Sequence, residues 1–166
     1  MKEIFERTSV RSYAQKEVEE DKIQELLRSA MASPTALNQQ AREYVVVTDK
    51  PTLAKLSKVS PGAIHLENAQ LCIAVCFNND LAISVDYFQQ DCSASTENIL
   101  LSATSLGLGG VWMGIAPNKE RMERVSQVLE LPSNVLPFNL ISLGYPKDKP
   151  TPKQKFNPKS IHYQKY

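Results

Sequence analysis

The stretch Asn98–Asn118, NILLSATSLGLGGVWMGIAPN, contains no charged residue and changes its pattern halfway along. Its first half spaces apolar residues as a helix does, and its second half is a glycine-punctuated segment of strand character. A membrane-spanning helix is the alternative for an uncharged run of this length, but four glycines interrupt it and Glu97 and Lys119 bracket it closely. The pattern therefore predicts a core helix over Asp91–Leu106 followed by a core strand over Val111–Ile115.

The segments outward from this stretch predict further helices and strands. Apolar residues at helical spacing, with acidic residues in the first turn, indicate an amphipathic helix over Val18–Ala32, and a shorter helix opens the chain before Arg7. Because helices outnumber strands around one modest sheet, the fold class expected is α+β. The remaining predicted elements are strands at Tyr44–Thr48, Leu71–Phe77 and Leu136–Leu143, and helices at Pro51–Val59 and Asn118–Leu129.

Length, charge and cysteine content exclude several classes of protein. A chain of 166 residues fits a single domain, 1–166, whose core needs no disulfides. Its 19 basic and 18 acidic residues nearly balance, which argues against recruitment of nucleic acid or of an anionic membrane. Three cysteines in apolar or helical surroundings fit reduced thiols, and the first residues lack the apolar core of a signal peptide. We therefore expect a cytoplasmic protein.

The last 20 residues, 147–166, differ in composition from the rest of the chain. They contain six lysines, three prolines and one acidic residue, with too little apolar periodicity for a compact element. We expect this tail to run extended over a surface. Because Phe156, Ile161, Tyr163 and Tyr166 favour burial, a second copy of the chain is a candidate for that surface.

Two basic segments could bind a phosphate. In Arg7-Thr-Ser-Val-Arg11, two guanidinium groups flank a hydroxyl, and the rigid donor fork of arginine suits a phosphate or a conjugated carbonyl. In Lys153-Gln-Lys155, a pair of point charges could close over a phosphate. For either segment alone, solvated surface charge is the commoner explanation.

Two further segments suit a flat ligand. The loop Ser33–Gln40, SPTALNQQ, carries short polar side chains that can bond to a heteroaromatic edge, although alone it indicates only turns. Gly107–Gly114, GLGGVWMG, differs from a dinucleotide-binding fingerprint because its glycines follow a helix and open a strand, and Trp112 replaces the third glycine. These glycines instead predict that a planar ligand approaches main-chain donors near Gly114.

The chain offers no hydrolytic or metal-binding constellation. His65 and His162 are its only histidines, and neither metal-ligand spacing nor a nucleophile elbow is present. Cys72 and Cys76 share one face of a predicted strand, where core thiols are commoner than ligands. Any catalysis therefore requires a cofactor, and no metal is expected.

Taken together and in this order, these segments resemble the nitroreductase family of FMN-dependent oxidoreductases. The resemblance covers nearly the whole chain, through RTSVRSY, SPTALNQQ, DCSASTENILLSATSLGLGGVWMG, LISLGYP and PKQKFNPKSIHY. It implies a three-layer α+β fold whose central, mostly antiparallel sheet is flanked by helices. It also implies a homodimer with two FMN molecules in the interface, each touched by both chains, and a tail, 147–166, that wraps the partner subunit.

The resemblance assigns candidate cofactor-binding residues by position. One subunit would anchor the phosphate, ribityl chain and pyrimidine edge with Arg7, Thr8, Ser9 and Arg11, and would add Lys153 and Lys155 as final phosphate contacts, although the family usually has arginine at the second. The opposite subunit would contribute Pro34, Thr35, Ala36, Asn38 and Gln40. Met113 and Gly114 match the strand whose backbone N–H faces flavin N5.

Two further positions bear on the site. His65 lies near a position that is sometimes basic in the family, and Ala41-Arg42 stands where many members have a proline and an aromatic residue, which would alter the substrate shelf. A fixed cation such as Arg11 would stabilise negative charge at the pyrimidine edge of the flavin.

The function implied is an FMN-dependent NAD(P)H oxidoreductase that reduces nitroaromatics, quinones or similar electron-poor small molecules by ping-pong hydride transfer through flavin N5. One alternative is a non-catalytic flavin-binding redox sensor or FMN reservoir, which the short connection before the central helix favours. Another is a purely structural α+β interaction protein, which would leave Arg7, Ser9, Arg11 and Lys155 without a purpose.

Overall fold

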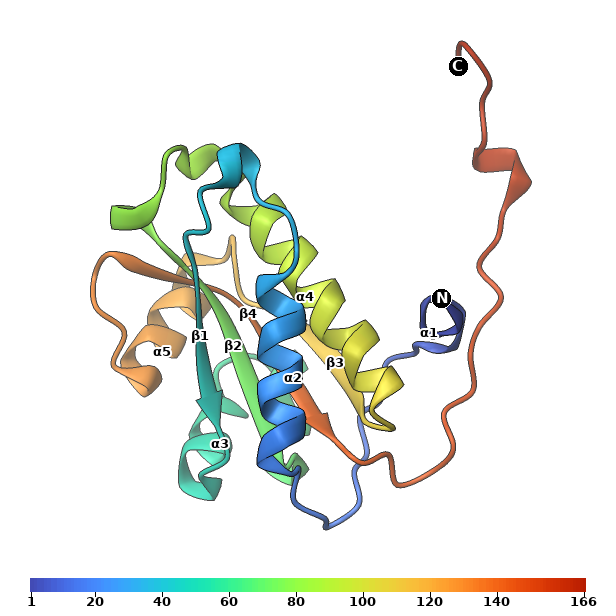
Figure 1. Ribbon diagram of the computed structural model, residues 1–166. Helices are drawn as coiled ribbons and strands as arrows, with labels where there is room; N and C mark the ends of the chain where they lie inside the picture. Colours follow the sequence, from blue (N-terminus) through green and yellow to red (C-terminus); the bar gives the residue numbers. More distant parts are fainter.

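A four-stranded antiparallel sheet forms the centre of the protein, which we describe from a computed structural model of residues 1–166 (Figure 1). The strand order is β1-β2-β4-β3, so the two central strands are β2 and β4 and the two edges are β1 and β3. All three pairings are antiparallel. The strands are β1 (Arg42–Val47), β2 (Leu71–Asn78), β3 (Gly109–Gly114) and β4 (Val135–Gly144).

Helices cover both faces of the sheet. In Figure 1, α2 and α4 lie over one face, while α3 and α5 lie over the other. This arrangement confirms the three-layer α+β fold predicted from the sequence. The helices are α1 (Lys2–Glu6), α2 (Glu20–Met31), α3 (Lys50–Leu56), α4 (Phe88–Ser105) and α5 (Lys119–Leu129), with short 3-10 turns η1 (Ala36–Asn38), η2 (Pro61–Asn68), η3 (Asn79–Leu81), η4 (Val85–Tyr87) and η5 (Pro158–Ser160).

The two faces of β2 supply two separate hydrophobic cores. Ile73 and Val75 pack with α2 and α4, whereas the alternate residues Cys72, Ala74 and Cys76 pack with α3, α5 and η2. Burying each large apolar side chain contributes roughly 1.5–3 kcal/mol to folding. All three cysteines are free and buried, which confirms the prediction that Cys72 and Cys76 are core thiols, and burial raises the pKa of Cys76 to about 12.

The glycines of β3 allow two neighbours to approach closely, the segment around Val10 at Gly109 and strand β4 at Gly110. A Cβ on Gly109 would lie 2.5 Å from Cγ2 of Val10, and a Cβ on Gly110 would lie 2.8 Å from the carbonyl oxygen of Ser142. The strand begins at Gly109, two residues before the predicted start, because Gly109 pairs with Gly144 of β4. The prediction of a helix followed by a strand within Asn98–Asn118 is therefore confirmed.

Other predicted elements are present with shifted ends. The predicted helix over Pro51–Val59 begins one residue earlier, capped by Asp49, and ends at Leu56, where the Ser57 hydroxyl donates to the carbonyl of Ala54 at 2.9 Å. None of the helices combines the length and apolar composition required to cross a membrane.

The C-terminal tail, residues 147–166, is exposed along its whole length and extends away from the sheet in Figure 1. Its only regular element is the short turn η5. Phe156 and Tyr163 remain 73% and 78% exposed, so the chain itself provides no surface that buries them. The expectation of an extended tail is confirmed, while its contact with a partner subunit stays a prediction.

Candidate functional site

Residues near the N-terminus run beside the start of β3. Ser9 forms a parallel bridge with Gly110, and the backbone N–H of Val10 donates to the carbonyl of Gly110 at 3.0 Å. Because the side chains at the start of β3 are hydrogen atoms, this segment can approach the sheet edge closely. The pairing fixes the direction in which Arg11 continues from the edge.

The root of the tail runs antiparallel to the next part of this segment. Residues 12–14 bond to residues 145–147, and the Tyr13 ring packs on Gly144, where a Cβ would lie 3.0 Å from the ring. The Tyr13 hydroxyl donates to the carbonyl of Val10 at 2.8 Å, and burial raises its pKa. The joining contacts are Ala14 N–H to Tyr145 C=O at 2.8 Å, Lys147 N–H to Ser12 C=O at 3.1 Å, and the Tyr13–Pro146 bridge.

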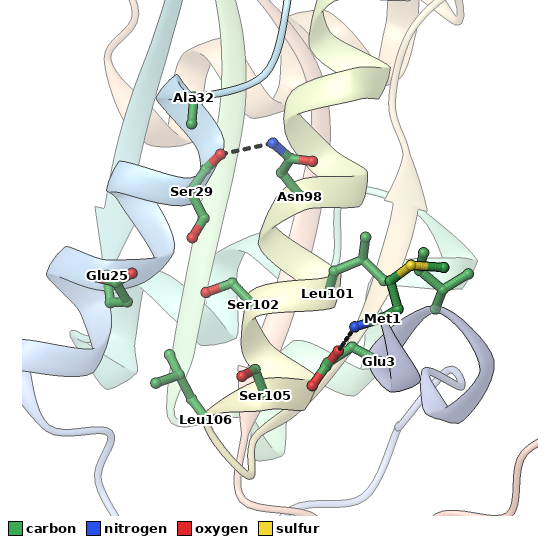
Figure 2. A pocket seen from close by; sticks show the side chains of 11 residues that line it. Met1, Glu3, Glu25, Ser29, Ala32, Asn98, Leu101, Ser102, Ser105 and Leu106 are labelled. Carbon is green, nitrogen blue, oxygen red and sulfur yellow. Dashed lines mark hydrogen bonds and ion pairs between the residues drawn. The ribbon is translucent and has the colours of Figure 1, made fainter.

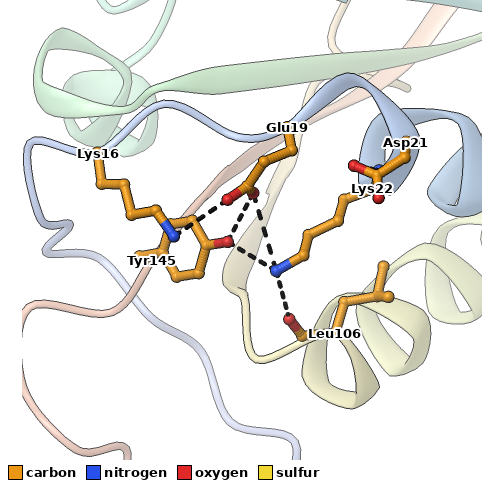
Figure 3. Close-up of polar contacts among 6 residues, drawn as sticks. All are labelled: Lys16, Glu19, Asp21, Lys22, Leu106 and Tyr145. Atoms are coloured by element: carbon orange, nitrogen blue, oxygen red, sulfur yellow. Dashed lines mark hydrogen bonds and ion pairs between the residues drawn. The ribbon is translucent and has the colours of Figure 1, made fainter.

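Tyr145 is also held by its side chain, as Figure 3 shows. Its hydroxyl donates to Glu19 Oε2 at 2.6 Å and accepts from Lys22 Nζ at 2.6 Å, and Lys16 Nζ lies 3.8 Å from the ring centre. Lys22 also donates to the carbonyl of Leu106 at 3.2 Å. This cluster joins the tail root to the start of α2 and the end of α4, so the first residues of the tail have a defined position.

A cavity of about 300 Å³ lies between these two parts of the chain. Its charged side chains are the cations Arg11, Lys149 and Lys153 and the single carboxylate Asp148, and hydroxyl groups complete its polar lining. This donor set fits a phosphate, because excess positive charge and several O–H and N–H donors face one space. The lining residues are Thr8, Ser9, Val10, Arg11, Ser12, Asp148, Lys149, Pro150, Thr151 and Lys153. We call this space the cation cavity.

Only two of the four predicted basic residues line the cation cavity. Arg11 and Lys153 line the cation cavity, together with Thr8 and Ser9, whereas Arg7 and Lys155 do not. The Arg7 Nε lies 3.4 Å from Glu97 Oε1 of α4, so this guanidinium is already paired. Lys149 was missed by sequence reasoning, because nothing but the basic composition of the tail distinguishes it from its neighbours.

His65 lies half-buried on η2, within electrostatic range of Arg11. Burial, and secondarily the positive charge of Arg11, lower the pKa of His65, which favours the neutral imidazole at pH 7. His65 is not among the residues that line the cation cavity.

The loop 33–40 lies at the opposite end of the molecule, beside the first turn of α4 (Figure 1). Gln40 N–H donates to Thr35 Oγ1 at 3.2 Å, and Gln40 Nε2 donates to Asn38 Oδ1 at 3.1 Å. The N–H of Ala36 bonds to Asp91, and Pro34 is exposed. The structure thus groups the five predicted loop residues with one another but not with Arg11.

Met113 and Gly114 end strand β3 in different surroundings. Met113 is 4% exposed and packs in the core beside α5, so its side chain does not face solvent. Gly114 is exposed, no atom lies within 4 Å of the place its Cβ would occupy, and its carbonyl accepts from Arg121 at 3.4 Å. The backbone at Gly114 is therefore open to a flat ligand.

The largest cavity, of about 580 Å³, lies between α1, α2 and α4 (Figure 2). No lysine or arginine lines it, and its apolar contributors include Ile4 and Leu101, with the hydroxyls of Ser102 and Ser105. Its chemistry suits a protein surface better than a phosphate.

Comparison with known proteins establishes the family. The family model described as "Putative TM nitroreductase" matches residues 1–165. The chain belongs to the nitroreductase family. It is 39% identical over 170 residues to a "Putative NADH dehydrogenase/NAD(P)H nitroreductase" of Archaeoglobus fulgidus, covering 100% of this chain and 98% of that protein. These matches confirm the resemblance predicted from the sequence and make the protein an oxidoreductase.

Solved structures of similar proteins share the fold. The "Putative NADH Oxidase" of Clostridium acetobutylicum is 40% identical, with a TM-score of 0.96 and 99% of each chain covered. An "FMN-dependent Nitroreductase" of Clostridium difficile R20291 is 26% identical, with a TM-score of 0.92 and 100% of each chain covered. The fold class predicted from the sequence is thereby confirmed.

Proposed function

We propose that the protein is an FMN-dependent NAD(P)H oxidoreductase that works as a homodimer and reduces nitroaromatic, quinone or similarly electron-poor molecules by ping-pong hydride transfer. The observation that carries this proposal is the cation cavity, in which Arg11 and Lys153 meet from opposite ends of the chain. The names of the relatives support it, since one is FMN-dependent and another is an NAD(P)H nitroreductase. FMN, when bound, supplies the hydride-transferring centre that no side chain here provides.

The side chains of the cation cavity would divide the binding of FMN. Lys153 and Lys149 would hold the phosphate as point charges, and the hydroxyls of Thr8 and Ser9 would donate to phosphate or ribityl oxygens. Arg11 would stabilise negative charge at the pyrimidine edge, which favours hydride acceptance. The exposed backbone at Gly114 leaves room for the ring system, whose open face must receive donor and acceptor in turn.

A second copy of the chain would complete the site. The loop 33–40 is attached to the first turn of α4, while Ser9 pairs with Gly110 beyond the last turn of this 18-residue helix. Such a helix is about 27 Å long. One subunit therefore does not bring this loop to its own cation cavity, but a partner subunit could.

The surface around the cavity of Figure 2 is suited to that partner. Ile4 and Phe5 of α1 are 54% and 73% exposed, and the neighbouring face of α4 presents uncharged residues such as Leu101 and Ser105. Contiguous exposed apolar side chains beside an uncharged helix face are typical of subunit interfaces. We expect α1 and α4 to contribute to the dimer interface.

A non-catalytic flavin sensor or FMN reservoir is the second candidate function. Only the short turns η3 and η4 join β2 to α4, so little chain is available there to roof a substrate pocket. An open site would bind FMN without holding an acceptor in a reactive position.

The test separates binding from turnover. The purified protein is titrated with FMN while absorbance is recorded, and the loaded protein is then mixed anaerobically with NADH or NADPH in a stopped-flow instrument. Bleaching of bound flavin within seconds supports the enzyme, and a loaded protein that neither donor bleaches supports the sensor. A protein that takes up no FMN contradicts both. The variant Arg11→Ala, which removes a cation from the cavity, should slow this bleaching, and Arg28→Ala, at an exposed arginine of α2, is its control.

A further inference from the structure

A buried carboxylate holds the loop 33–40. Asp91, in the first turn of α4, is only 3% exposed. Its Oδ1 accepts from the backbone N–H of Ala36 at 2.8 Å, and its Oδ2 accepts from Gln39 Nε2 at 2.7 Å. Both oxygens of the carboxylate are therefore committed to the loop.

Gln39 extends this connection to a third segment. Its side chain is buried, and its Oε1 accepts from the backbone N–H groups of Ile83 at 3.0 Å and Ser84 at 2.9 Å. The amide orientation follows from these partners, because the carboxylate requires a donor and the two N–H groups require an acceptor. A single relay of hydrogen bonds thus ties α4, the loop 33–40 and the turn between η3 and η4 together.

The loop needs such an external support. Leu37, Asn38 and Gln40 have φ values of 54°, 51° and 50°, a left-handed conformation that residues with a Cβ rarely adopt. The loop also exposes Leu37, which gains nothing from burial in this chain. The conformation therefore depends on contacts such as those from Asp91 and Gln39.

We propose that Asp91 is a positioning residue for the cofactor site, which holds the loop 33–40 in the conformation that contacts FMN on the partner subunit. The inference rests on the proposed function. Asp91 does not touch the cofactor itself, because it is buried and both its oxygens are occupied. It acts through Ala36, whose position it fixes directly, and through Gln39, which precedes Gln40 in the chain.

The substitution Asp91→Asn tests this role. The introduced amide presents an NH₂ group to one partner that is itself a donor, either Gln39 Nε2 or the N–H of Ala36, so one of the two contacts is lost. We expect FMN to bind on the order of tenfold more weakly, the change that corresponds to one charge-assisted hydrogen bond. The KM values for the acceptor and for the nicotinamide donor should both rise as well, because both occupy the open face of the flavin in turn.

A double variant provides the rescue. In Asp91→Asn combined with Gln39→Glu, the introduced amide donates to the introduced carboxylate, whose second oxygen still accepts from the N–H groups of Ile83 and Ser84. Every polar group of the relay then has a partner. Only the bond between positions 91 and 39 has its donor and acceptor exchanged. We expect FMN affinity to return to within about twofold of the unmodified protein, the difference expected when no polar group is left unpaired.

Tyr44→Phe is the matched control, because it removes the Tyr44–Ser95 hydrogen bond of 2.8 Å between β1 and α4 without touching the loop. It should lower the melting temperature and leave FMN affinity unchanged. The inference is overturned if Asp91→Asn binds FMN normally, if the double variant fails to recover, or if the control loses affinity equally. If the unmodified protein binds no FMN, the proposed function itself fails. If it binds FMN and one of these three results is found, only the role of Asp91 fails.

Discussion

The cation cavity and the loop 33–40 are two halves of one proposed site built on different principles. The cation cavity brings exposed charged side chains together through backbone pairing between the two chain ends, whereas a buried carboxylate holds the loop. Arg11 and Lys153 would act by charge, so added salt or the loss of one of these side chains should weaken the binding of an anion gradually. Asp91 acts by geometry, so one wrong donor disturbs the whole loop.

This difference separates the functions of the two halves. In the proposed site, charge in the cation cavity would govern affinity for an anionic group and the potential of a bound ring system, while the shape of the loop would govern what can lie beside that ring. Substitutions that damage each half separately test this difference, and loss of the tail should have a larger effect than loss of any single side chain.

Removal of residues 147–166 should have the largest effect. The truncated chain loses Lys149 and Lys153, and with them most of the positive charge of the cation cavity. It also loses the exposed aromatic residues that we expect to bury on the partner subunit. FMN affinity should fall by more than a hundredfold, roughly what two charge-assisted contacts supply, and the dimer should dissociate.

The measurement combines an FMN titration with light scattering on the eluting protein, and circular dichroism confirms that the truncated chain is folded. Because no residue of 147–166 belongs to either hydrophobic core, the fold itself should persist. A truncated chain that remains a dimer with bound FMN would contradict the role given to the tail.

Arg11→Ala should have the second largest effect, and it should act on potential more than on binding. The guanidinium would stabilise negative charge at the pyrimidine edge, so its loss lowers the reduction potential of bound FMN and slows hydride acceptance. Affinity should decrease by about tenfold or less. The potential is measured by equilibration with a reference dye, with Arg28→Ala as control; an unchanged potential would refute this role.

Much of the fold follows from the sequence because periodicity is a local property. The amphipathic pattern of α2, the apolar run of β2 and the pattern change within Asn98–Asn118 each report on neighbours along the chain. The strand order is not local, since β4 lies between β2 and β3 only after the chain has passed through α4 and α5. Patterns along the chain carry no signal for that choice.

The candidate site was predictable to a similar extent. Arg11 and Lys153 were found through a resemblance in sequence, and the structure brings them to one cavity. Lys149 and Asp91 were not singled out, because a lysine in a basic tail and an acid in the first turn of a helix both have ordinary explanations. An acid at the start of a nearly uncharged helix was the available signal, but its burial and its partners become visible only in three dimensions.

Lys149→Ala and Lys153→Ala should each weaken FMN binding by a smaller factor, about three- to tenfold, since lysine acts as a point charge in a partly screened site. The loss should shrink as salt rises from 50 to 500 mM, whereas the loss in Asp91→Asn should not. Titration of each variant at both salt concentrations checks this contrast. Lys165→Ala, at the far end of the tail, is the control, and an equal loss there would mean that net charge alone is responsible.

The smallest predicted effect concerns Tyr145 and the position of the tail root. The hydrogen bond from Tyr145, followed by a backbone hydrogen bond and the bond from Lys16, lowers the pKa of Glu19 to about 2. Because the folded pKa lies below the ordinary value of 4.5, the stabilisation from Glu19 is present above pH 4.5 and is lost as the pH falls toward 2. Solvent screens this exposed cluster, so the change is small.

Urea unfolding of the unmodified protein and of Tyr145→Phe between pH 4.5 and 2 measures this change in the free energy of unfolding. The variant should lose less stability on acidification, because its Glu19 no longer has the phenol donor, and two parallel pH profiles would show that Tyr145 holds the tail root without help from the carboxylate.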